Sequence, residues 1–313
     1  MSLDLYSIGS WTIFDHLLRM ERLPQEGETL PLSMPIEEME KVHFGDCSAN
    51  IAAVAAKLGC RTGLGMVVGD DFVASGYAAH LEALGVDLAG TALIPGARSG
   101  HSFNFFDAQN RGFCVSHLGV AEHQDEWQAP LAEIGRARAL VVSEAFSPYT
   151  LAAIEHAKAA GLTTAINGMV ATAGDKAGRF LAACDLLFLS RGESAALMAS
   201  LGCASPAGIL AHGPRLVVVT GGDTGSRWFT AEGETHVPAV TAARFVDSTG
   251  AGDSFVAASL AAWLKGWPIP VVGGFAAAVA SFVVEAWGCQ TNLPSFTAAA
   301  DRYRAAFGKE LPS

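Results

Sequence analysis

Short, β-branched apolar runs alternate with longer alanine-rich segments of helical period along most of this chain. The run 216–219 (LVVV), for example, is continuously apolar, as is typical of a strand that is buried on both faces. Strand–helix alternation builds βαβ units, because neighbouring parallel strands need a long crossover between them. The sequence therefore predicts an α/β fold with a mostly parallel central sheet and helices on both of its faces.

The expected elements follow one another along the whole chain. Gly59 and Gly85 stand directly behind two of the expected helices, where glycine commonly ends a helix. We expect strands at 3–8, 61–68, 139–143, 162–166, 185–189 and 215–220, and helices at 48–58, 72–84, 149–160, 193–201, 251–265, 271–287 and 295–307.

Two stretches break this rhythm. Residues 11–42 hold several prolines and no helical period, and residues 102–117 alternate around Asn110-Arg111-Gly112, a hairpin signal. A lid over an active site and an ordinary surface excursion both fit this pattern. We expect a main domain from residues 1–10, 43–95 and 120–313, and a small β-sheet lid from residues 11–42 and 96–119.

Charge and cysteine usage exclude several classes of protein. The net charge is −11 and the basic residues are scattered, so a nucleic-acid binder is not expected. The six cysteines form no CxxC pair, and no basic segment followed by an apolar one opens the chain, which together favour reduced thiols and a cytoplasmic location.

The apolar stretch 271–287 carries Glu285 and is shorter than the ~20 residues of a membrane span, so we expect a buried helix there.

The segment 247–255 (DSTGAGDSF) directly precedes a predicted helix and carries the strongest chemical signal. Small residues let the backbone approach a ligand closely, and the free N–H groups of a first helical turn attract anions. Asp253 in that turn could accept a proton from a hydroxyl that attacks a phosphoryl group. A purely structural alternative, in which Thr249 caps the helix and Asp253 complements its dipole, fits equally well.

The same segment resembles the C-terminal signature of the ribokinase/PfkB family of carbohydrate and nucleoside kinases. Weaker matches follow in the family's order: Gly9-Ser10 with Asp15, then 23–29 (LPQEGET), 45–59 (GDCSANIAAVAAKLG), 68–71 (VGDD) and 84–87 (LGVD). The resemblance covers almost the whole chain. It implies a ribokinase-like three-layer α/β/α domain with a small β-sheet lid.

The resemblance also implies roles for individual residues. Asp253 would be the general base, and Gly250, Ala251 and Gly252 would form an amide hole for the transferred phosphoryl group. Asp15, Gly45 and Asn50 would bind hydroxyls of the acceptor. Asp46 replaces the second glycine of the first signature in a gapless match, where its carboxylate could bind another hydroxyl or face water.

The cofactors implied by the resemblance are ATP and Mg²⁺, with K⁺ as a further candidate. Glu193 would organise Mg²⁺ through water, although Ser190 stands where the family has asparagine, and only Asn167 is retained of the preceding DxN motif. Asp247 lies where relatives bind a potassium-like ion. ATP would contact Thr220, Gly222, Gly225 and Thr249.

The resemblance implies an ATP-dependent kinase for a small polyol, with a sugar or sugar acid first and a nucleoside second. A nucleoside needs an apolar wall for its base. A sugar- or nucleotide-binding sensor without activity is the non-enzymatic alternative. Neither nucleic acid nor membrane is an expected partner, whereas a homodimer through the lid is common among relatives. Candidates for the base wall are Trp11, Phe14, Phe103, Phe105, Phe106 and Phe113.

Overall fold

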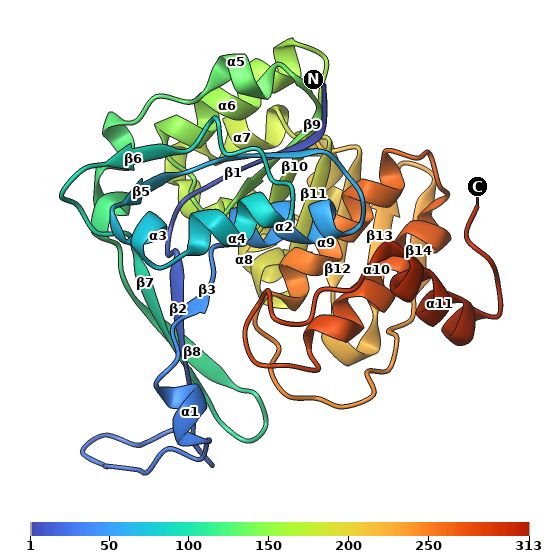
Figure 1. The fold of residues 1–313 in the computed structure, drawn as a ribbon. Coiled ribbons are helices and arrows are strands. Elements are labelled where there is room, and N and C mark those ends of the chain that lie inside the picture. Colours follow the sequence, from blue (N-terminus) through green and yellow to red (C-terminus); the bar gives the residue numbers. More distant parts are fainter. Residues whose placement is uncertain (1, 313) are drawn as a thin grey trace.

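A computed structural model describes residues 2–312, and its centre is an eight-stranded sheet (Figure 1). The strand order is β14-β13-β12-β11-β10-β9-β1-β4. Strands from β12 to β4 in this order run parallel, and β13 and β14 add an antiparallel edge. The strands are β1 (Leu3–Ile8), β4 (Thr62–Gly65), β9 (Ala137–Ser143), β10 (Thr163–Asn167), β11 (Leu186–Ser190), β12 (Leu216–Thr220), β13 (Ser226–Thr230) and β14 (Gly233–Val237).

Helices cover both faces of this sheet, because its parallel strands are apolar on both sides. In β9, Ala139 and Val141 belong to one buried core, and Leu140 and Val142 belong to the other. The first core lies under α2 (Cys47–Lys57), α9 (Ala251–Trp263) and α10 (Ile269–Val283), with α11 (Phe296–Phe307) packed on α10. The second lies under α5 (Leu131–Ile134), α6 (Pro148–Ala159), α7 (Ala177–Ala182) and α8 (Arg191–Leu201). The predicted three-layer fold is confirmed.

A smaller sheet stands off the main body, at the lower left of Figure 1. Its order is β3-β2-β7-β8, with β2 and β7 parallel and the outer pairs antiparallel. The predicted turn at Asn110 joins β7 to β8, and β3 falls just beyond the expected boundary at residue 42. The elements are β2 (Phe14–Arg19), β3 (His43–Phe44), β7 (His101–Phe106) and β8 (Gly112–His117), with α1 (Ile36–Met39) at the far end.

Two expected elements are each divided in the structure. The strand expected at 61–68 becomes β4 in the main sheet and β5 (Val67–Gly69), which pairs with β6 (Ala92–Ile94) in a separate sheet. The helix expected at 72–84 becomes α3 (Asp71–Ala74) and α4 (Tyr77–Ala83). Between them Gly76 has a φ of +84°, a left-handed conformation that interrupts a helix.

Helix α10 occupies most of the apolar stretch 271–287 and is largely buried, as expected. In the part of the chain that the structure describes, four short 3₁₀ segments complete the elements. Within residues 2–312 no single helix has the length and hydropathy to cross a membrane. The two helices Arg191–Leu201 and Pro206–His212 reach that length and hydropathy only when taken together, and the chain bends by 56° between them. The 3₁₀ segments are Gly119–Glu126, Val170–Lys176, Pro206–His212 and Gly222–Thr224.

Candidate active site

Asp253 lies in the first turn of α9, where that helix begins beside the carboxyl ends of the parallel strands. Its side chain is 5% exposed. The side-chain amide of Asn50 donates to Oδ2 at 2.9 Å, and that of Asn167 donates to Oδ1 at 2.9 Å. Burial raises the pKa of Asp253 to about 7, because the hydrogen bonds that it accepts offset only part of the cost of desolvation. A carboxylate with a pKa near neutrality suits a general base.

The loop before Asp253 is shaped by its glycines. Gly250 has a φ of +78°, and a Cβ there would lie 2.7 Å from Cβ of Cys289, so the position requires glycine. A Cβ at Gly252 would meet no atom within 4 Å, so this residue borders open space. The amide of Ala251 donates to the Ser248 carbonyl at 3.1 Å and is thus already used within the loop.

Asp247 anchors this loop from a buried position. Its Oδ1 accepts from the Thr249 amide at 3.1 Å and the Thr249 hydroxyl at 2.8 Å, and its Oδ2 accepts from the Gly288 amide at 3.0 Å. The sequence resemblance places Thr249 in contact with ATP. In the structure its hydroxyl donates to Asp247 within its own loop.

Asp15 lies on β2 in the small sheet and is buried. Its carboxylate accepts from the Ser102 hydroxyl at 2.5 Å and from Sγ of Cys289 at 3.3 Å. Burial raises the pKa of Asp15 to about 6. A Cβ at Gly45 would lie 2.4 Å from Oδ2 of Asp15, so glycine at this position leaves the room that the carboxylate occupies.

A buried polar network connects the Asp253 side of the site with the Asp15 side. Besides donating to Asp253, Asn50 accepts from Nε2 of Gln290 at 2.9 Å. The same Nε2 lies 2.6 Å from the Tyr77 hydroxyl, which donates to the Gly45 carbonyl at 2.6 Å. Asn50 therefore orients the candidate base in this structure. Sequence reasoning missed Gln290 and Tyr77, because nothing in their surroundings in the sequence marks them as polar network members.

Asp46 is positioned differently from the expectation. It has a φ of +70° and caps α2, with Oδ1 accepting from the Ser48 and Ala49 amides at 2.9 and 3.2 Å. Oδ2 accepts from the Trp11 amide at 2.8 Å. Because both oxygens are engaged by the protein itself, Asp46 serves as a helix cap and neither faces water nor presents a free carboxylate to an acceptor.

Glu144 is a site residue that sequence reasoning missed. It directly follows β9, has a φ of +55°, and lines a cavity together with Asp253. Burial, followed by the nearby charge of Asp253, raises the pKa of Glu144 to about 8. A glutamate at the carboxyl end of a buried parallel strand was the available signal, because ligands bind at this edge of α/β sheets.

The cavity beside Asp253 has a volume of about 190 Å³. It brings together Asp253, Gly252, Glu193 and Thr220 among the predicted residues, whereas Gly222, Gly225 and Thr249 do not line it. The full lining is Cys47, Glu144, Asn167, Gly168, Met169, Phe188, Leu189, Ser190, Glu193, Thr220, Gly252, Asp253 and Val256.

Gly222 and Gly225 shape the turn after β12. A Cβ at Gly225 would lie 2.1 Å from the Val237 carbonyl oxygen, and its φ is +83°, so this glycine is required where the turn packs on β14. Gly222 also has a positive φ, +61°, but borders open space. The Cβ position of Gly222 thus leaves room for a ligand, whereas that of Gly225 is filled by the backbone of Val237.

Ser190 and Glu193 form a reciprocal cap at the start of α8. The Ser190 amide donates to Oε2 of Glu193 at 2.6 Å, and the Glu193 amide donates to the Ser190 hydroxyl at 3.3 Å. Residues 2–312 contain no group of three or more His, Cys, Asp and Glu side chains that could hold a metal. One or two carboxylates beside phosphate oxygens still suit Mg²⁺, which keeps much of its water, so Glu193 fits the predicted role.

The aromatic residues considered for a nucleobase wall divide between the two faces of the small sheet. Asp15 and Arg19 alternate with His16 and Leu18 along β2, and Phe106 stands opposite Arg19. Phe103, Phe105 and Phe113 therefore lie on the face opposite Asp15, where ring centroids of Phe105 and Phe113 are 5.1 Å apart. Phe14 packs into a core with α2 and α4. These four rings do not line the acceptor side.

The comparisons with known proteins agree in finding kinases of carbohydrates or nucleosides. The model of the pfkB family carbohydrate kinases matches residues 20–295. The chain is 30% identical to a nucleoside kinase of Methanothermobacter thermautotrophicus, over 99% of this chain and 98% of that one. A deoxyribokinase of Salmonella typhi is 24% identical over 94% of this chain and 96% of its own. The solved structure of Burkholderia thailandensis nucleoside kinase with inosine superposes with a TM-score of 0.87 at 21% identity, covering 98% of this chain and 99% of that one.

Proposed function

The chain belongs to the pfkB family of carbohydrate kinases, and on this premise we propose that it phosphorylates a hydroxyl of a nucleoside with ATP. The observation that carries the choice of acceptor is the full-length similarity to an archaeal nucleoside kinase. Sequence analysis had placed a sugar or sugar acid first and a nucleoside second. The relatives favour the opposite order.

Asp253 would act as the general base of this reaction. Its carboxylate is held by Asn50 and Asn167 and borders the cavity that also contains Gly252. When ionised, it accepts the proton of the attacking hydroxyl, while the first turn of α9 attracts the phosphoryl oxygens. Mg²⁺, held through water by Glu193, would neutralise charge on the nucleotide phosphates.

The ribose of the acceptor would bind between Asp15 and Asn50. Hydroxyl groups both donate and accept hydrogen bonds, so a carboxylate and an amide suit them. Residues 11–42 and 96–119, together with β3, would act as the lid over this site. Thr220 and Gly222 would approach ATP, whereas Gly225 and Thr249 contribute by shaping their loops.

A sugar kinase is the second candidate, supported by the deoxyribokinase relative. The same carboxylates would bind a free pentose, because a nucleoside and a pentose present similar hydroxyls. A sensor without activity has less support, since the candidate base and the glycine loop before it are both retained.

K⁺ beside Asp247 and a homodimer through the lid stay predictions. Replacing K⁺ by tetramethylammonium at constant ionic strength tests the first, and sedimentation of the purified protein tests the second. Loss of activity without K⁺ would support the ion site, and unchanged activity would contradict it.

The deciding experiment is an ADP-release assay with Mg²⁺ and ATP over nucleosides, pentoses, hexoses and sugar acids. Turnover with nucleosides at the highest kcat/KM supports the proposal. Higher kcat/KM with a free sugar or sugar acid would transfer the assignment to a sugar kinase. ATP binding without turnover across the panel would contradict the proposed activity.

A further inference from the structure

Arg19, at the end of β2, reaches from the small sheet to the loop that precedes Asp253. Side chains alternate along a strand, so Arg19 points to the same side of the small sheet as Asp15. The side chain is only 14% exposed. Its Nη2 lies 3.2 Å from Oδ1 of Asn110 and 3.8 Å from Oδ1 of Asp247. A cation of the small sheet thus stands beside the buried carboxylate that anchors the loop.

Aromatic rings from both parts of the molecule flank this guanidinium. Its central carbon lies 5.8 Å from the ring centroid of Phe106 on β7 and 5.2 Å from that of Trp287. Such contacts stabilise a cation that is partly removed from water. Trp287 directly precedes Gly288, whose amide is bound by Asp247.

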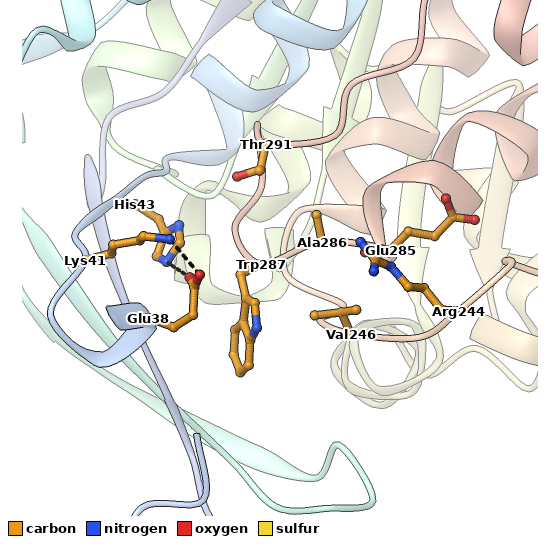
Figure 2. A pocket seen from close by; sticks show the side chains of 9 residues that line it. All are labelled: Glu38, Lys41, His43, Arg244, Val246, Glu285, Ala286, Trp287 and Thr291. Atoms are coloured by element: carbon orange, nitrogen blue, oxygen red, sulfur yellow. Dashed lines mark hydrogen bonds and ion pairs between the residues drawn. The ribbon is translucent and has the colours of Figure 1, made fainter. Parts of the chain in front are cut away.

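In Figure 2 the Trp287 ring lies between two groups of side chains. Lys41 and Glu38, from the segment between β2 and β3, lie on one side, and Val246, which precedes the loop 247–252, lies on the other. These residues line a cavity of about 400 Å³ between the two parts. Its charges are largely compensated in the structure, since Lys41 pairs with Glu38 at 2.6 Å and Arg302 with Glu285 at 2.8 Å.

Asn110 makes a second connection at the tip of the β7–β8 hairpin. It has a φ of +60°, and its Nδ2 donates to the Ser248 hydroxyl at 2.6 Å. Because Asn110 also accepts from Arg19, the two residues form one hydrogen-bonded path from the small sheet to Ser248. The Ser248 carbonyl in turn holds the amide of Ala251.

We propose that Arg19 is a positioning residue that orders the loop 247–252 when the small sheet closes over the site. Thr249 and Gly288 supply the hydrogen bonds of buried Asp247, and Arg19 would add a positive charge beside it while the lid is closed. Movement of the lid would withdraw this charge and the Asn110–Ser248 bond together. Each closure of the lid would thus order the phosphate-binding loop, and a bound acceptor would favour this closed, ordered state. This inference rests on the proposed phosphoryl transfer for its effect on catalysis.

The test compares Arg19→Met, Arg19→Lys and Asn110→Ala with a matched control, Arg22→Met. Arg22 is also a lid arginine, but it pairs with Glu28 within the same segment at 2.6 Å. We expect Arg19→Met to lower kcat by about 10- to 100-fold, the effect of losing one charged, partly buried interaction. KM for the acceptor should change much less. Lysine should restore part of kcat, Asn110→Ala should cost less than Arg19→Met, and Arg22→Met should resemble the wild type.

Hydrogen exchange of the 248–252 amides in the ligand-free protein provides a readout that does not depend on activity. Faster exchange in Arg19→Met than in wild type and Arg22→Met, with an unchanged melting temperature, supports the inference. Unchanged exchange would overturn it, as would a kcat equal to that of the control. If the wild type shows no turnover, the proposed function fails, and the exchange comparison still decides the role of Arg19.

Discussion

The carboxyl edge of the central sheet and the small sheet contribute to one site from different surroundings. Asp253, Asn167 and Glu144 extend from strands and a helix that are buried on both faces. In the small sheet, all residues of β8 are exposed, and Phe113 and Val115 on its outer face are 48% and 53% exposed. Under the proposed function, proton transfer would thus depend on the densely packed part of the molecule, and acceptor recognition on its more exposed part.

The largest effect is expected at the rigid edge. Asp253→Asn removes the proposed base and should lower kcat by ~10²–10⁴-fold while the chain still folds. Steady-state kinetics with ATP and the best acceptor measure this loss. Asp175→Asn, at a side chain that is 93% exposed, is the matched control and should keep full activity. Full activity in Asp253→Asn would remove the functional distinction between the two regions.

A different kinetic signature is expected from the small sheet. Asp15→Asn should raise KM for the acceptor by about 10- to 100-fold, because a hydrogen bond to a charged group is lost. KM for ATP should stay close to the wild-type value. A fall in kcat with an unchanged KM would instead place Asp15 with the chemistry and break the comparison.

Gly45→Ala sharpens the same point without changing the charge. The new Cβ would lie 2.4 Å from Oδ2 of Asp15, so the carboxylate must shift, and KM for the acceptor should rise by about tenfold. Gly178→Ala, where a Cβ meets no atom within 4 Å, is the control and should leave KM unchanged. Equal KM values in both variants would show that the position of the Asp15 carboxylate is not limiting.

The pH dependence should follow the carboxylates of the site whose pKa values are raised. Burial raises the pKa values of Asp15, Asp253 and Glu144 to about 6, 7 and 8, above those of the unfolded chain. The folded state thus binds more protons, and stability should fall as pH rises from 5 to 9. Thermal unfolding of wild type and Glu144→Gln measures this, and the variant should lose less stability between pH 7 and 9. Parallel stability curves for the two proteins would contradict the raised pKa of Glu144.

Activity should rise with pH through about 7, as Asp253 ionises.

The smallest effect on the folded chain is expected at the outer face of the small sheet. Phe113→Ser should change the free energy of unfolding by less than ~0.5 kcal/mol in the monomer, because the ring is half exposed. If this face joins two copies, sedimentation should show a shift from dimer to monomer. An unchanged dimer would place the contact elsewhere.

Much of the fold could be predicted because the responsible signals are local. Strand β1 was predicted with its observed bounds, and the breaks at Gly59 and Gly85 follow the two helices as expected. The division of the strand at 61–68 could not be predicted, since an apolar run does not reveal which sheet it joins. The hairpin of β13 and β14 was missed for lack of a strong turn signal.

The site could be predicted only in part. The position of Asp253 in a first helical turn follows from the glycines before it and the alanine-rich helix behind it. The capping role of Asp46 was harder to foresee, because it depends on a positive φ and on the Trp11 amide from a distant segment. Thr249 and Gly225 likewise turned out to shape their own loops.

The sequence by itself determined the alternation of strands and helices, the parallel sheet, and the carboxylate at the start of α9. These features depend on periodicity and on neighbours within one turn. Only the tertiary structure decided that Asn50, 203 positions away, orients Asp253 and that Arg19 stands beside Asp247. Such contacts depend on the relative placement of elements that are distant in the chain, which is set by the packing of whole faces and not by any local run of residues.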